Sequence, residues 1–160
     1  MKYNLNSEKY IKISNNVKEI FENYRKKLPA KEAGGILLGR VIKNKHIIIE
    51  SITEPNRFDI SRFFGFIRNK KQAQTAINQS WKDSGGEIIY LGEWHTHNEN
   101  IPTPSSQDRK TMNTLLLTSK IEINFLFLVI IGIQEDFVGV QTSLGLRKLN
   151  KAKDENYYLL

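Results

Sequence analysis

Cysteine is absent from this chain of 160 residues. Its absence excludes disulfide bonds, thiolate metal ligands and a cysteine nucleophile, so any hydrolysis has to use water, a hydroxyl group or a metal ion. A long hydrophobic run is also lacking, because the longest, 125–133, is far shorter than the about 20 residues of a membrane-spanning helix. Residues 1–10 are polar and lack the apolar core of a signal peptide. We therefore expect a cytoplasmic protein without a membrane segment.

The composition is that of one soluble globular domain. Hydrophobic residues make up 39% of the chain and charged residues 26%, which is ordinary for a soluble protein with a sizeable core. The formal net charge of +7 at pH 7 favours acidic partners. Charge alone does not choose among nucleic acid, an acidic protein face and a membrane surface, and a basic surface that only faces solvent explains it equally well.

The first part of the chain predicts a strand, a helix and a β-hairpin. Residues 10–13 form a short strand, and residues 16–19 read as a capping box before apolar side chains at helical spacing. Pro29 marks the end of this helix. Two apolar runs, 34–41 and 46–52, flank a short polar turn, which is typical of a hairpin. These two strands open the predicted sheet.

The remainder predicts further helices and strands around one less regular segment. Residues 54–71 show no clear period, so we expect a loop there. Helical spacing over 73–81, followed by Gly85 and Gly86, predicts a second helix. The later elements are a strand that contains two histidines, a third helix over about 112–120, a buried central strand over 125–133 and a last strand over 137–146.

Together these elements predict an α/β (α+β) fold, a single domain with a mixed central β-sheet flanked by about three helices. We assign the domain to residues 1–150. Residues 151–160 are then a C-terminal tail, either flexible or docked on the domain as a strap. No internal repeat or low-complexity segment is visible.

His95 and His97 lie two residues apart at the end of an apolar run. On a strand this spacing directs both imidazoles to the same face. A short loop then leads to Asp108, where a helix begins. Two imidazoles and one carboxylate are a common ligand set of catalytic zinc, with water in the fourth position. The third histidine, His46, has no such neighbours and reads as a surface residue of a strand.

Ser105 and Asp108 also have a purely structural interpretation. A serine at the N-cap with an acid three residues later is a helix start whatever the function of the protein. The two interpretations are compatible, because the free amides of a first helical turn stabilise an ionised carboxylate there.

The residue patterns leave the general base undecided among three glutamates. Glu93 shares the strand parity of His95 and His97, Glu99 lies in the following loop, and Glu32 precedes a different strand. Periodicity favours Glu93, although a charge at the edge of a sheet explains that residue equally well.

The combined motif resembles the JAMM metalloproteases of the JAB/MPN fold. The signature of that family is a glutamate, then His-x-His, seven residues, serine, two residues and aspartate, and it is matched by Glu32, His95, His97, Ser105 and Asp108. The resemblance implies a cytidine-deaminase-like sandwich and one Zn²⁺ per chain, held by His95, His97 and Asp108. It further implies that Glu32 is the catalytic base and that Ser105 stabilises the oxyanion.

Residues 90–97 narrow the resemblance further. They are similar to the prokaryotic JAB deconjugating peptidases of integrative elements and of CBASS-type antiviral defence operons. This implies an isopeptidase that removes a protein conjugated through its C-terminus, either a ubiquitin-like modifier or a cyclic-nucleotide synthase. Ubiquitin-type activating and conjugating enzymes of the same operon are the implied partners. One departure is Asn98, where many family members have proline.

Three alternatives remain at this level. A RadC-like DNA-associated protein carries a similar motif and suits a basic chain, but the match at Glu32 speaks against it. A non-catalytic MPN scaffold typically lacks the ligand set that is intact here. A serine hydrolase would need a Gly-x-Ser-x-Gly elbow, which is absent. For the substrate surface, the aromatic and basic stretch 57–71 and an exposed strand that pairs with the substrate are candidates, whereas a loop packed by its own phenylalanines is the structural alternative.

Overall fold

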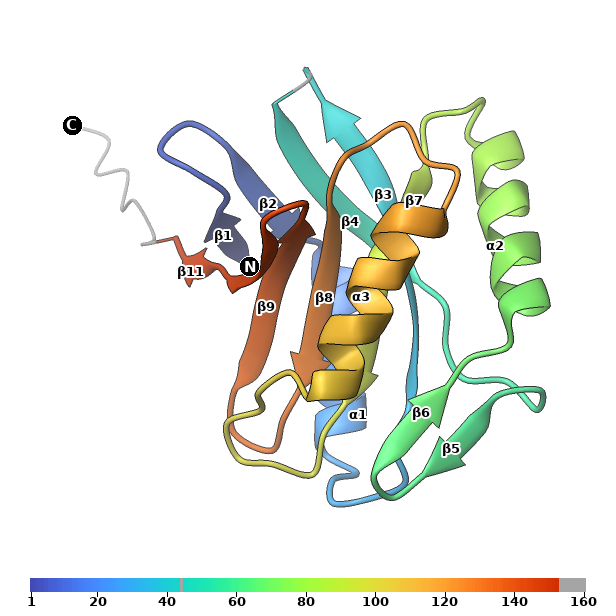
Figure 1. Ribbon diagram of the computed structural model, residues 1–160, viewed down its shortest axis with the longest axis vertical. Helices are drawn as coiled ribbons and strands as arrows, with labels where there is room; N and C mark the ends of the chain where they lie inside the picture. The colour runs from blue at the N-terminus through green and yellow to red at the C-terminus, as the bar shows by residue number, and fades with distance from the viewer. Residues whose placement is uncertain (44, 153–160) are drawn as a thin grey trace.

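A mixed sheet of nine strands forms the centre of the molecule (Figure 1). The computed structural model describes residues 1–43 and 45–152. The strands of this sheet are β1 (Lys2–Asn4), β2 (Tyr10–Ile13), β3 (Gly34–Ile42), β4 (His46–Ile52), β7 (Ile89–Thr96), β8 (Leu126–Ile131), β9 (Asp136–Thr142), β10 (Gly145–Lys148) and β11 (Asn150–Lys151). Their order is β10-β9-β8-β7-β3-β4-β2-β1-β11. The pairs β2 with β4 and β7 with β8 are parallel, and the other pairs are antiparallel.

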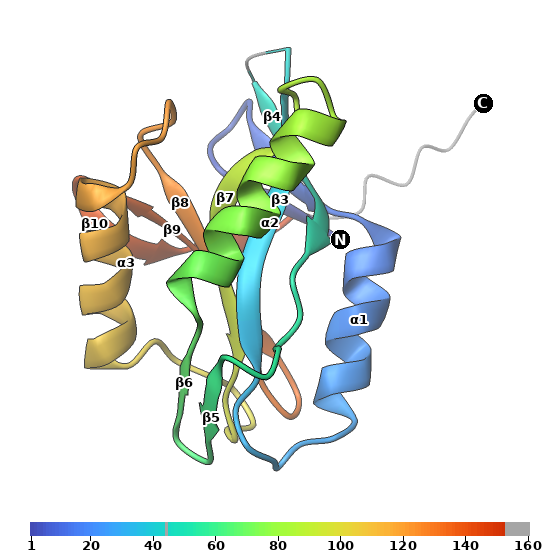
Figure 2. The ribbon, with the colours of Figure 1, turned by 90° about the vertical axis from the view of Figure 1, so that its right-hand side faces the viewer.

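The described residues contain three helices, which cover both faces of the sheet. They are α1 (Asn15–Arg25), α2 (Lys70–Asp83) and α3 (Ser106–Thr118). Figure 2 shows α1 on one face, with α2 and α3 on the opposite face. Val17 and Phe21 of α1 belong to one buried apolar cluster, whereas Ala73 of α2 and Met112 of α3 belong to another. The predicted α/β sandwich with three helices is therefore confirmed.

The strand β8 is apolar along its whole length because both of its faces are covered. Each of its six residues is buried. Phe127 and Val129 point into the cluster under α1, and Leu128 points into the cluster under α2 and α3. The sequence correctly predicted this interior strand. It lies parallel to β7, which we call the histidine strand because it contains His95 and leads to His97, and it sets Ile131 beside Thr96 at the end of that strand.

Within residues 54–71, which were predicted to be a loop, residues 60–67 form a second, small sheet, so the prediction was wrong for that part and holds for 54–59. The strands β5 (Ile60–Arg62) and β6 (Gly65–Ile67) pair antiparallel, and α2 already begins at Lys70. Figures 1 and 2 show this hairpin below the first turn of α2, beside the main sheet. Strands of three residues are too short to show a period in the sequence, which explains the error.

Two other predictions require correction. The single strand expected over 137–146 is divided into β9 and β10 by a turn at residues 143–144, after which Gly145 begins β10 with φ of 110°, a conformation that favours glycine. The first helix is capped by Ser14 and not by a box starting at Asn16, because the Ser14 side chain accepts a hydrogen bond from the Val17 N–H.

The side chain of Trp81 fits the helical spacing of α2, yet it is 57% exposed.

At the edge of the sheet, β1 lies between β2 and β11. Lys151, the first residue of the expected tail, pairs with Tyr3 in β11. Residues 153–160 of that tail lie outside the described residues, so the division into a domain (1–150) and a tail (151–160) stays a prediction. None of the described helices is long and apolar enough to cross a membrane.

Candidate metal centre

The end of β7 places two histidines on one face of the sheet. The strand lies between β3 and β8, with Gly34 and Ile130 as the partners of His95. Trp94 points to the α1 face, where its ring packs against Phe21 at a centroid distance of 5.3 Å. His95 and His97 point to the opposite face, with their Nε2 atoms 3.1 Å apart. The common direction that the two-residue spacing predicted is therefore confirmed.

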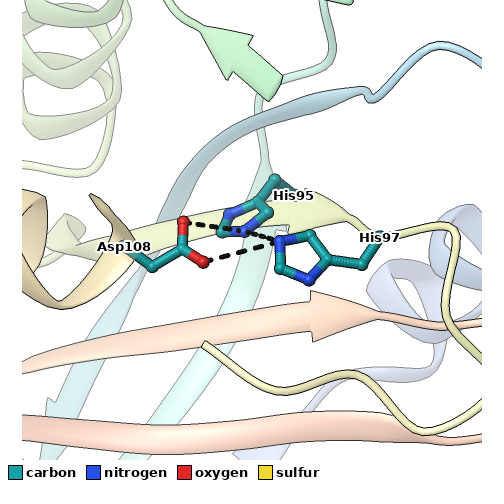
Figure 3. A group of neighbouring side chains, drawn as sticks. All are labelled: His95, His97 and Asp108. Atoms are coloured by element: carbon teal, nitrogen blue, oxygen red, sulfur yellow. Dashed lines mark hydrogen bonds and ion pairs between the residues drawn. The ribbon is translucent and has the colours of Figure 1, made fainter. Parts of the chain in front are cut away.

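Asp108 completes a compact group with these histidines (Figure 3). Its Oδ1 lies 3.2 Å from Nε2 of His95, and its Oδ2 lies 3.5 Å from Nε2 of His97. One ligand atom from each of the three residues lies within 4.8 Å of the others. The end of β7 and the first turn of α3 thus bring two imidazole nitrogens and one carboxylate to a single point.

The donor set fits a zinc-sized cation. Tetrahedral zinc with bonds of about 2.1 Å separates its ligand atoms by roughly 3.4 Å, close to the separations seen here. The cluster contains two nitrogen ligands and one oxygen ligand, as catalytic zinc sites commonly do. The buried Nδ1 of His97 has no hydrogen-bond partner in the described structure, and the nearest carboxylate oxygen, from Glu99, is 3.9 Å away. Nδ1 therefore remains free to carry the imidazole proton while Nε2 faces the cluster.

The first turn of α3 holds the Asp108 carboxylate in place. Ser105 caps the helix, its Oγ accepts from the Asp108 N–H at 3.1 Å, and Asp108 Oδ2 accepts from the Ser105 N–H at 2.7 Å. The Ser105 hydroxyl also donates to Oδ2 at 2.8 Å. Burial opposes ionisation of Asp108, but hydrogen bonds from His95 and His97 outweigh it, so the pKa of this carboxyl lies far below its usual range. The predicted capping box is confirmed.

Glu32 lies beside the same cluster. Its side chain is buried and lines one cavity together with His95, His97 and Asp108. Burial raises the pKa of Glu32 above its ordinary value, and the two histidines oppose this shift only in part. A carboxylate with a raised pKa is a stronger base. The residue that the family motif singles out therefore lines the same cavity as the three potential metal ligands.

Hydrogen bonds of the residues just before β3 set the position of Glu32. The Ala33 N–H donates to the Thr96 hydroxyl at 3.0 Å, and the Thr96 N–H donates back to the Ala33 carbonyl at 2.8 Å. The Glu32 N–H donates to the Arg62 carbonyl at 2.6 Å. Sequence reasoning missed Thr96, because nothing in the pattern around it indicates a partner 63 residues away.

The other two glutamates have different surroundings. Glu93 shares the parity of His95, as expected, but its carboxylate forms a bidentate pair with Arg68 at 2.7 and 2.8 Å and accepts from the Tyr90 hydroxyl at 2.5 Å. Glu99 is half exposed and accepts from the Thr103 N–H. The partnership of Arg68 with Glu93 was also missed, and it makes Arg68 a structural residue, not a free surface cation.

The cluster lies between two cavities that meet at the hairpin. The first, of about 270 Å³, is lined by Glu32, the histidines, Ser105, Asp108 and residues 64–66 of the hairpin. The second, of about 360 Å³, runs between β6 and α3 and has a more apolar lining that includes Ile67, Met112 and Leu115. Phe66, His95, Gln107 and Asp108 line both. The segment that was expected to be a loop is therefore a wall of the site.

The chain matches a family model described as prokaryotic homologs of the JAB domain over residues 15–143. It is also 32% identical to an Escherichia coli protein named CD-NTase/cGAS isopeptidase, over 75% of this chain and 74% of the relative. Proteins of the same name from Vibrio cholerae and Pseudomonas aeruginosa are 31% and 38% identical, over 68% and 61% of this chain. The matched regions cover 66% and 64% of those two relatives, just under two thirds of their length.

Solved structures support the fold. A solution structure of a Desulfitobacterium hafniense protein is similar with a TM-score of 0.61 and 22% identity, and the match covers 86% of this chain and 88% of that one. A solution structure of a Salinibacter ruber protein has a TM-score of 0.51 at 12% identity, covering 93% of this chain and 95% of that one. At these identities the likeness concerns the arrangement of helices and strands alone.

The close approach of β3 to the histidine strand leads to a first prediction. A methyl group added at Gly34 would lie 2.5 Å from the Trp94 carbonyl oxygen, 2.7 Å from the Phe66 ring and 2.9 Å from Cβ of His95. Because these atoms belong to β7 and the hairpin, Gly34→Ala has to displace them. We expect the affinity for zinc to fall roughly 10- to 100-fold, as when a residue supporting a metal ligand is lost. Competition with a chromogenic zinc indicator measures it.

Gly65→Ala is the matched control, because a methyl group added there meets no atom within 4 Å. Its zinc affinity should equal that of the wild type. Wild-type affinity in Gly34→Ala would show that the contact between β3 and β7 does not determine where His95 lies.

Proposed function

The chain belongs to the family of prokaryotic homologs of the JAB domain, and from this premise we propose that it is a zinc-dependent isopeptidase. In this proposal it hydrolyses the amide bond that joins the C-terminus of a conjugated protein to its target. The name CD-NTase/cGAS isopeptidase, carried by relatives 31 to 38% identical, supports this activity and supports a cyclic-nucleotide synthase as the conjugated protein.

The observation that carries the proposal is the convergence of four side chains on one cavity. His95, His97 and Asp108 supply the ligand atoms of a metal site, and Glu32 lines the same cavity. A scaffold protein needs no such convergence. A buried carboxylate beside a ligand set with an open fourth position is the arrangement that metal-assisted hydrolysis requires.

In the proposed mechanism zinc, when bound, lowers the pKa of water toward 7 and polarises the scissile carbonyl, as in other zinc hydrolases. Glu32 accepts a proton from the attacking water and passes it to the leaving amine nitrogen as the C–N bond breaks. Ser105 donates its hydroxyl hydrogen to the developing oxyanion. That hydrogen can turn away from Asp108 while Ser105 Oγ still accepts from the Asp108 N–H, so the helix cap is kept.

The two cavities suggest where the substrate lies. An extended C-terminal segment with apolar side chains fits the cavity between β6 and α3, and it ends at the cluster. In the small sheet β6 pairs only with β5, so within the described residues its other edge is free to add a substrate strand. The hairpin carries exposed apolar side chains, among them Phe63 and Phe64, which extend this surface toward a protein partner.

Metal removal gives the primary test. We expect purified protein to bind one zinc ion per chain and to release a cyclic-nucleotide synthase from an isopeptide conjugate made through its C-terminus. A chelator should stop the cleavage, and added zinc should restore it. Zinc content by mass spectrometry and the appearance of free synthase on gels measure both effects.

His97→Ala should lose both zinc and cleavage, whereas His46→Ala is the matched control and should keep both, because His46 lies outside the cluster. A protein that binds no zinc, cleaves no conjugate and instead binds duplex DNA in a salt-dependent manner would support the RadC-like alternative.

The assignment of the general base can be tested with two isosteric changes. Glu32→Gln should lower kcat by roughly a thousandfold, because the amide cannot accept the proton of the attacking water. Glu93→Gln should change kcat only a few-fold but lower the thermal midpoint, because it weakens the buried pair with Arg68. Steady-state kinetics and thermal unfolding separate the two effects. An inactive Glu93→Gln with an active Glu32→Gln would assign the base to Glu93.

Ser105 combines a proposed catalytic role with a helix cap, and two substitutions separate them. Ser105→Gly removes the hydroxyl at a cost of only a few tenths of a kcal/mol to the cap, whereas Ser105→Thr keeps both functions. We expect kcat to fall on the order of a hundredfold or more in Ser105→Gly, as for the loss of one oxyanion donor, and to change little in Ser105→Thr. If kcat of Ser105→Gly stays near the wild-type value, Ser105 is a cap only.

A further inference from the structure

The side chain of Asn98 joins three segments at the rim of the first cavity. Its Oδ1 accepts a hydrogen bond from the Ala30 N–H at 2.9 Å. Its Nδ2 donates to the Ala30 carbonyl at 2.9 Å and to the Phe63 carbonyl at 2.9 Å. Both amide hydrogens and the amide oxygen are thus used, and each partner is a backbone group.

The first of these partners lies on the segment that carries Glu32. Ala30 is two residues before Glu32, and the pair of hydrogen bonds with Asn98 fixes its peptide groups from one side. Thr96 fixes Ala33 in the same way from the adjoining residue of the histidine strand. Glu32 therefore lies on a short connection that is held on both sides by residues flanking His97.

The second partner is the tip of the β5–β6 hairpin. This hairpin forms its own two-stranded sheet, and such a sheet is marginally stable alone in water. Three of its apolar side chains, Ile60, Phe63 and Phe64, are 47%, 48% and 85% exposed, so their burial contributes little to holding it. Two carbonyl groups at its tip tie it to the site: Arg62 accepts from the Glu32 N–H, and Phe63 accepts from Asn98.

We propose that Asn98 is a positioning residue, whose amide fastens both the Glu32 segment and the hairpin wall of the cavity to the histidine strand. The inference rests on the proposed function for its kinetic consequence but not for the contacts themselves. The position of the hairpin determines the position of β6, whose unpaired edge and whose cavity with α3 are the proposed substrate surface. A loosely held hairpin therefore has to become ordered each time a substrate binds. That ordering weakens substrate binding more than it slows the chemical step.

An asparagine is suited to this position because it is a donor and an acceptor at once. Proline, the residue of many JAB/MPN proteins here, stiffens the backbone but offers no side-chain hydrogen bond. Aspartate matches asparagine in shape and can still accept from the Ala30 N–H, yet it has no hydrogen to donate to the carbonyl groups of Ala30 and Phe63. Asn98→Asp therefore removes the fastening of the hairpin with little change in volume.

Asn100→Asp is the matched control. It makes the same change of charge two residues later in the same loop, where the side chain is exposed and makes no hydrogen bond within the part of the chain that the structure describes. Asn100 does not line either cavity of the site. Asn98→Pro is a second variant, which loses the hydrogen bonds without adding a charge next to His97.

Hydrogen exchange and steady-state kinetics on the full-length zinc-loaded protein test the proposal. In Asn98→Asp and Asn98→Pro we expect the amides of residues 60–67 to exchange roughly tenfold faster, the change that follows from the loss of about one net hydrogen bond. KM for the conjugate should rise by about tenfold in both variants. In Asn98→Asp, which can still accept from the Ala30 N–H, kcat should change less than about threefold, whereas in Asn98→Pro, which loses both hydrogen bonds to Ala30 and so loosens the Glu32 segment, kcat should fall further. Asn100→Asp should match the wild type in both measurements, and zinc content should be equal in all four proteins.

Any of three results overturns the proposal. The first is that hairpin exchange and KM in both Asn98 variants equal those of Asn100→Asp, and the second is that exchange becomes faster while KM stays unchanged. The third is that exchange becomes faster through the whole central sheet and the thermal midpoint falls. The proposed function fails separately. If the wild type cleaves no conjugate, the isopeptidase assignment is wrong, and the kinetic role of Asn98 is wrong with it. Faster amide exchange limited to residues 60–67 in the Asn98 variants would still show that Asn98 holds the hairpin in place.

Discussion

The antiparallel pairing of β3 with β7 is the constraint on which the site depends. It sets Gly34 opposite His95, and the absence of a side chain at Gly34 lets the two backbones approach closely. The residues just before β3 are thereby brought to the end of β7, where Ala33 and Thr96 exchange hydrogen bonds. The pairing of the strands therefore places Glu32 beside His95 and His97.

The histidine strand serves two purposes through alternate residues. His95 and His97 face Asp108, whereas Thr96 and Asn98 bond the segment that carries Glu32. Because neighbouring residues at the end of β7 and just after it contact both the metal-ligand cluster and the segment that carries Glu32, the position of one is coupled to that of the other. The β5–β6 hairpin is attached to the same frame through the carbonyl groups at its tip.

Surroundings, more than position along the strand, distinguish the glutamates. Glu93 has the parity that a base on the histidine strand would need, but Arg68 and Tyr90 occupy its carboxylate oxygens. Glu32 is buried beside the cluster, and this burial raises its pKa. The family resemblance and the geometry favour Glu32 for independent reasons, one from the match of the sequence to the family motif and one from burial beside the cluster.

The sequence by itself determined what depends on short range: the common face of His95 and His97, the helix start at Ser105 and Asp108, and the run of interior strand residues. These follow from the periods with which side chains alternate along a strand, two residues, and around a helix, 3.6 residues, and both periods can be seen in neighbouring residues of the sequence. Only the tertiary structure decided that residues 64–68 form a wall of the site, that Arg68 pairs with Glu93, and that Asn98 bonds Ala30. Those partners are brought together by strand order across the sheet, and no local pattern records which distant segments become neighbours.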